Sequence, residues 1–116
     1  MKDEVKIEVI GFEHVLTEVS YAPVVSAICA VRNVPFQGTA NISYVPNGYL
    51  LEFESFDLWL QSISLTETTI EGLTRMIFDA LRSVLGDIPL RVTFEATTAV
   101  HAPVSVTIIQ TGEETR

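Results

Sequence analysis

Residues 29–52 decide the fold that this sequence predicts, and they read CAVRNVPFQGTANISYVPNGYLLE. The pair Asn47-Gly48 lies between two short runs that mix apolar and polar residues, 42–45 and 49–52. Asn-Gly tolerates the positive φ angles that a tight hairpin turn requires. We therefore predict a β-hairpin over residues 38–54.

Strands are also predicted towards both ends of the chain. Apolar and polar residues alternate with period two over 4–12, 90–97 and 104–109, which is typical of strands with one buried face. Residues 13–35 follow no single period, because Pro23 and Pro35 interrupt an apolar series. There we expect an irregular stretch with a short helix or strand near 24–31. The polar tail, 111–116, is expected to be frayed.

Two helices are predicted between the hairpin and the last two strands. The first covers about residues 55–63. The second carries apolar residues at helical spacing and ends at Gly86. Thr68 and Glu71 stand three residues apart at its start, which is the spacing of a capping box. The apolar residues of the second helix are Ile70, Leu73, Ile77, Phe78, Leu81 and Leu85.

The order of these elements predicts an α+β fold. Strands that precede two helices, followed by further strands, favour helices packed on an antiparallel sheet, and we predict an antiparallel four-stranded sheet with two helices on one face. At 116 residues the chain is expected to form a single domain, residues 1–116. A sheet of this kind has exposed edges, so we expect copies to assemble into a closed oligomeric barrel.

Composition argues against several classes of function. The chain has 15 acidic and 7 basic residues and a net charge of −8. That charge repels phosphate groups, so neither strong nucleic-acid binding nor membrane association is expected. No apolar run reaches the roughly 18 residues of a membrane-spanning helix, and the charged N-terminus does not resemble a signal peptide. A single cysteine, Cys29, cannot form an internal disulfide, so we expect a cytoplasmic protein.

A spaced set of residues within 29–46 carries a resemblance to a known family. A cysteine is followed by a proline six residues on, then a threonine, then Ile-Ser-Tyr-Val-Pro. This segment resembles the nitrile reductases, tunnelling-fold (T-fold) enzymes that reduce 7-cyano-7-deazaguanine in queuosine biosynthesis. The resemblance covers about residues 25–96 and implies the T-fold, which pterin- and purine-handling enzymes share. The matching residues are Cys29, Pro35, Thr39, Ile42, Ser43, Tyr44, Pro46, Glu52, Ser55 and Glu71.

The resemblance implies roles for four of these residues. Cys29 would be the nucleophile that adds to the nitrile and forms a covalent thioimide, a reaction that suits a thiol because it is strongly nucleophilic. Glu71 would anchor the purine edge, and Glu52 and Ser55 would belong to the substrate-binding motif. The implied partners are a purine- or pterin-like small molecule and further copies of the chain.

The residues alone leave other readings open. Cys29 in an apolar run also fits a buried structural cysteine, and Glu71 also fits a helix cap. Arg32, His14 or His101 would activate Cys29 only if the fold brings one of them close. No metal is expected, because one cysteine and two distant histidines do not make a zinc set. The acidic cluster of Glu52, Glu54 and Asp57 is best explained as a solvated face.

Several positions depart from the family pattern. Phe36 stands where the family places a proton-donating aspartate, and Ile70 stands where it places a histidine. Glu54 and Asp57 occupy the positions of two lysines in the family's NADPH motif. This charge reversal should repel a phosphate-bearing cofactor, so we expect no NADPH and no other cofactor. A later Arg-Gly-Gly is replaced by residues 97–100.

Three functions remain open at this point. The first is a 7-deazaguanine- or purine-binding enzyme that uses Cys29. If a nitrogen nucleophile replaces hydride, this enzyme would resemble the archaeal amidinotransferases of tRNA modification. The second is a non-catalytic T-fold binding protein or structural oligomer in which Cys29 only packs. The third is a pterin enzyme of the same fold that uses Glu71 in the same anchoring way.

Overall fold

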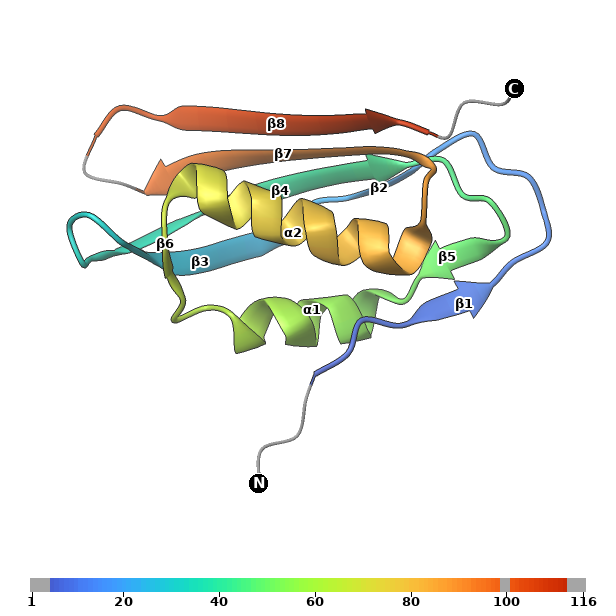
Figure 1. Cartoon of the computed structure of the whole chain (residues 1–116), viewed down its shortest axis with the longest axis horizontal. Coiled ribbons are helices and arrows are strands. Elements are labelled where there is room, and N and C mark those ends of the chain that lie inside the picture. Colours follow the sequence, from blue (N-terminus) through green and yellow to red (C-terminus); the bar gives the residue numbers. More distant parts are fainter. Residues whose placement is uncertain (1–4, 99–100, 113–116) are drawn as a thin grey trace.

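The computed structural model describes residues 5–98 and 101–112. Two helices and eight strands follow one another along this part of the chain (Figure 1). In order they are β1 (Val9–Gly11), β2 (Val19–Tyr21), β3 (Val24–Cys29), β4 (Pro35–Tyr44), β5 (Tyr49–Leu51), α1 (Phe53–Ser62), β6 (Glu67–Thr68), α2 (Ile70–Leu85), β7 (Pro89–Thr98) and β8 (Val104–Thr111).

The predicted α+β architecture is confirmed. The long strands β3, β4, β7 and β8 form an antiparallel sheet in that order, and both helices lie over one of its faces (Figure 1). Two short strands extend this sheet: β2 pairs with β4, and β6 pairs with β3 in the parallel sense. Within the described residues, no helix is long and apolar enough to cross a membrane.

The core lies between the sheet and α2. Side chains alternate along β4 and β7, so that every second residue faces the helices and is buried. The apolar stripe of α2 meets these residues, which is the packing that its 3.6-residue period predicts. The buried sheet residues include Phe36, Ala40, Ile42, Tyr44, Leu90, Val92, Phe94 and Ala96, and those of α2 include Leu73, Ile77, Phe78 and Leu81.

The hairpin predicted over residues 38–54 is wrong. β4 and β5 do not pair; β5 instead pairs with β1 in a separate two-stranded sheet. Gly48 has the expected positive φ of 91°, but Asn47 does not, so the two-residue turn is not formed. Both edges of β4 are already occupied, by β2 and β3 on one side and by β7 on the other.

The true hairpin in this half of the chain joins β3 to β4. The predicted first strand over 4–12 is reduced to β1, and the irregular region 13–35 contains β2 and β3. The strand alternative near 24–31 is therefore the right one. Asn33, with φ 60°, turns the chain, and its amide donates to the carbonyl of Cys29 at 2.7 Å. Of the tail expected to fray, Thr111 still belongs to β8, and 113–116 lie outside the described residues.

Gly38 marks the closest approach between two strands of the sheet. The register between β4 and β7 shifts between Gln37 and Gly38. A Cβ at Gly38 would collide with the carbonyl oxygen of Glu95 and would lie 2.7 Å from the ring of Phe94. Only glycine fits this position without displacing backbone.

We expect Gly38→Ala to lower the free energy of unfolding by about 2–3 kcal/mol, because an added methyl group overpacks the β4–β7 contact. Urea unfolding followed by circular dichroism measures the change. Gly11→Ala is the matched control, because a Cβ there meets nothing within 4 Å. Equal losses in the two variants would contradict the steric explanation.

Candidate functional site

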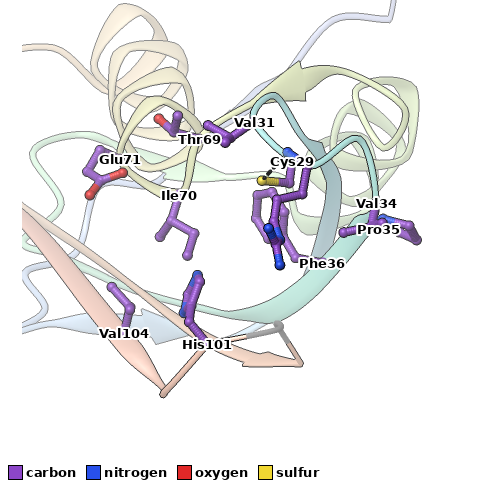
Figure 2. Close-up of a pocket in the computed structure, with 11 residues that line it drawn as sticks. Cys29, Val31, Val34, Pro35, Phe36, Thr69, Ile70, Glu71, His101 and Val104 are labelled. Atoms are coloured by element: carbon purple, nitrogen blue, oxygen red, sulfur yellow. Dashed lines mark hydrogen bonds between the residues drawn. The ribbon is translucent and has the colours of Figure 1, made fainter.

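Cys29 is held at the end of β3 by the turn that follows it. Its amide donates to the carbonyl of Val34 at 2.8 Å, which closes the β3–β4 hairpin. The amide of Arg32 points at the sulfur, with a nitrogen-to-sulfur distance of 3.5 Å (dashed line in Figure 2). The thiol is partly exposed. Cys29 is therefore neither a fully buried packing residue nor a freely rotating surface thiol.

A short parallel pairing brings α2 to this thiol. β6 aligns Thr68 with Cys29, and the amide of Ala30 donates to the carbonyl of Thr68 at 2.9 Å. α2 begins two residues later, at Ile70. The first turn of the helix is thereby fixed beside the β3–β4 turn, although the two segments are about 40 residues apart in sequence.

Cys29 and Glu71 line the same cavity, which has a volume of about 300 Å³. Three segments surround it: the β3–β4 hairpin, the start of α2, and the residues around the start of β8 (Figure 2). The lining residues are Cys29, Val31, Arg32, Val34, Pro35, Phe36, Thr69, Ile70, Glu71, His101 and Val104.

The deep wall of this cavity is apolar. Phe36 is 4% exposed and packs edge-on against Phe94, with 6.2 Å between ring centroids. Ile70 is also buried. These are the two positions at which the resemblance would place an aspartate and a histidine. The groups that can ionise, Cys29, Arg32, Glu71 and His101, are partly or fully exposed and line the cavity around this wall.

The carboxylate of Glu71 is not needed to cap α2. The N-cap is Thr69, whose hydroxyl accepts from the amide of Gly72 at 2.9 Å. The capping box predicted from Thr68 and Glu71 is therefore wrong by one residue. Glu71 occupies the first turn, where the partial positive charge of the helix end favours a carboxylate.

His101 and Arg32 are the two candidate partners of Cys29 that the fold brings to the cavity. The third candidate, His14, lies against Phe12, with 5.3 Å between ring centroids, in a separate hollow beside Gly48 and Tyr49. Sequence spacing gave no sign that His101 would line the same cavity as Cys29, a residue 72 positions earlier in the chain.

Glu52 and Ser55 do not lie at this cavity. They form the N-terminus of α1, directly after β5, whereas the cavity is lined by the end of β3, the β3–β4 turn and the start of α2 (Figure 1). The carboxylate of Glu52 accepts from the amides of Ser55 and Glu54 at 2.8 and 3.0 Å. The Ser55 amide, and more weakly that of Glu54, holds the pKa of Glu52 below its ordinary value, although desolvation acts in the opposite direction. The Ser55 hydroxyl donates to the Glu52 carbonyl and accepts from the Glu8 amide.

The acidic cluster beside α1 is partly engaged in structural contacts. The Tyr21 hydroxyl donates to both carboxylate oxygens of Asp57, each at 2.8 Å. Burial, together with this hydrogen bond and the charge of Asp57, raises the pKa of Tyr21 to about 12. Glu52 caps the helix and Glu54 is exposed. Across the described residues, no three His, Cys, Asp or Glu side chains are grouped so that they could hold a metal ion.

Comparison with known proteins identifies the architecture. No family model matches the sequence, and no curated protein matches it. Among solved structures, the chain is similar to the archaeosine synthase QueF-Like in the apo form, with a TM-score of 0.77 and 17% sequence identity. The match covers 85% of this chain and 98% of that one. At this identity the likeness is one of fold, and it confirms the T-fold predicted from the sequence.

We expect Glu52→Gln to lower the thermal unfolding midpoint at pH 7, because a neutral amide is a weaker partner for the two amides at the start of α1. A carboxyl group whose pKa is lowered by folding stabilises the protein above its ordinary value of 4.5, and this stabilisation is lost as the pH falls. The difference between variant and parent should therefore shrink by pH 3.

Thermal unfolding at pH 7 and pH 3, followed by circular dichroism, measures both effects. Glu54→Gln is the matched control, because this neighbouring side chain is exposed. A midpoint difference for Glu52→Gln that does not change with pH would show that the charge of Glu52 does not stabilise α1.

Proposed function

We propose that this chain binds a 7-deazaguanine or a related purine in the Cys29–Glu71 cavity, and that Cys29 adds to a nitrile carried by that base. The observation that supports the proposal is the shared cavity. The partly exposed thiol of Cys29 and the carboxylate of Glu71, which does not cap α2, line one mostly apolar hollow. A volume of about 300 Å³ lies at the small end of the range for ligand sites.

The polar and the apolar residues of the cavity would recognise different parts of the base. A carboxylate can accept two parallel hydrogen bonds from the ring N–H and the amino group of a guanine-like edge. Glu71 would supply this acceptor from the first turn of α2. The buried ring of Phe36 and the side chain of Ile70 would cover the faces of the base and exclude water.

The covalent step needs no further reactant. The sulfur of Cys29 forms a bond to the nitrile carbon, one π bond of the C≡N group breaks, and the thiol proton ends on the nitrogen. The product is a thioimide that joins base and protein. A thiol suits this reaction because its thiolate is a strong nucleophile.

We propose that reduction by NADPH does not follow. Glu54 and Asp57 carry negative charge where a phosphate-bearing cofactor would need cations, and Asp57 is engaged with Tyr21. The likeness to the archaeosine synthase QueF-Like favours a second candidate, in which a nitrogen nucleophile attacks the thioimide. The net charge of −8 counts against tRNA as the substrate of that reaction.

We also propose that the active form is a homo-oligomer. Among the described residues, β8 lies at one edge of the sheet, and the N-terminal half of β3 pairs on one side only. Val31 and Leu65 are 82% and 81% exposed near the Cys29 end of the molecule. Pairing between copies would cover these free edges and apolar side chains.

We expect the protein to gain the mass of one 7-cyano-7-deazaguanine per chain when the two are mixed. Intact-mass spectrometry measures the adduct. Cys29→Ser should abolish it while keeping the circular dichroism spectrum of the parent. An adduct that persists in Cys29→Ser would overturn the assignment of the nucleophile, and no adduct at millimolar ligand would favour the non-catalytic binding protein.

Glu71→Gln should weaken the binding of guanine or 7-deazaguanine by about 10- to 100-fold, because the amide keeps one uncharged oxygen acceptor and places an NH2 donor where the second carboxylate oxygen would accept. Isothermal titration calorimetry measures the dissociation constant. Glu67→Gln is the matched control, because Glu67 is an exposed carboxylate of β6 outside the cavity. Equal affinities in the parent and Glu71→Gln would refute the anchoring role.

A further inference from the structure

We infer that His101 is the proton-transfer residue for Cys29. This inference rests on the proposed function, because it assigns the group that moves the thiol proton during addition to the nitrile. The position at which the resemblance would place an acid holds Phe36, a buried ring packed on Phe94. Figure 2 shows His101 across the cavity from Cys29, with its ring directed towards Ile70.

Elimination among the ionisable groups of the cavity leads to this histidine. The described lining contains four such groups: Cys29 and Arg32 from the hairpin, Glu71 from α2, and His101. A guanidinium stays protonated in proteins, so Arg32 cannot transfer a proton. Glu71 must remain a carboxylate to accept from the base. Imidazole alone among these groups both accepts and releases protons near neutral pH without assistance.

A backbone contact fixes which nitrogen of His101 is available. Its Nδ1 lies 2.8 Å from the carbonyl oxygen of Ala102. A carbonyl oxygen only accepts, so Nδ1 carries the hydrogen and Nε2 of the neutral ring carries the lone pair. A base whose second nitrogen is oriented by another group is the arrangement that activates nucleophiles in many enzymes.

The β7–β8 pairing supports the position of the ring. Ala96 pairs with Val104, and Val104 itself lines the cavity. The strand that starts three residues after His101 is therefore fixed to the sheet beside the site. The charged groups that share the cavity with the ring are the carboxylate of Glu71 and the guanidinium of Arg32.

The proton that leaves the Cys29 thiol is transferred to the nitrile nitrogen through His101. Nε2 of neutral His101 accepts the proton of the Cys29 thiol, and the thiolate attacks the nitrile carbon. The imidazolium then returns the same proton to the nitrogen as the C≡N π bond breaks. The ring ends neutral, the product is the thioimide, and no oxidant or reductant takes part.

Alkylation of Cys29 by iodoacetamide tests the coupling without any purine. In the parent protein the rate should begin to rise at lower pH than in His101→Ala, because the imidazole accepts the thiol proton and no base replaces it in the variant. At pH 7 this variant should react about tenfold more slowly or worse. Coinciding profiles would overturn the inference.

The second arm uses 7-cyano-7-deazaguanine and the rate of adduct formation. His101→Ala should slow the adduct about 100-fold or more, while the dissociation constant for 7-deazaguanine, which has no nitrile, stays within about twofold. Added imidazole should restore part of the rate. A parallel loss of rate and affinity without rescue by imidazole would show a structural role and overturn the inference.

Two comparisons keep the possible failures apart. His14→Ala is the matched control, because this exposed histidine lies in a different hollow and should leave both rates unchanged. If the parent protein forms no adduct, the proposed function fails, and the alkylation profiles alone decide on His101. If the parent forms the adduct and His101→Ala forms it equally fast, only the inference about His101 fails.

Discussion

The short parallel pairing of β6 with β3 is the constraint on which the site depends. Backbone hydrogen bonds from Ile28 to Thr66 and from Ala30 to Thr68, each 2.9 Å, attach the chain before α2 to the edge of the sheet. Without this attachment, the core contacts of α2 with β7 would still orient the helix axis. They would not set how far the first turn, with Glu71, lies from Cys29. Two residues of strand therefore place the start of α2 beside the β3–β4 turn.

Local patterns predicted the parts of the fold that local physics controls. The apolar period of α2, its end at Gly86 and the alternation along β7 and β8 could all be read from the sequence, because each reflects burial of one face. The hairpin at Asn47-Gly48 could not be judged in this way. Whether β5 pairs with β4 depends on strands from other segments of the chain. β2, β3 and β7 pair with both edges of β4, and β5 therefore pairs with β1.

The same distinction holds for the site. Cys29 and Glu71 were predicted from a resemblance, and the structure places both at one cavity. Glu52 and Ser55 came from the same resemblance, yet within one chain they hold the start of α1. His101 was only one of three candidates, because spacing along the chain carries no information on which loop faces the β3–β4 turn. The β7–β8 hairpin supplies that information only after the sheet has formed.

Position 36 has a consequence for how readily this chain could change its chemistry. The ring of Phe36 belongs to the cavity wall and, through Phe94, to the hydrophobic core. An aspartate there would remove a buried ring, at a cost of about 3–5 kcal/mol, and would add the desolvation of a charge. Such a step would consume much of the stability of a small domain. The cavity rim, in contrast, belongs to exposed residues that can be exchanged singly, so variation in catalytic groups is accessible to evolution there and not at the wall.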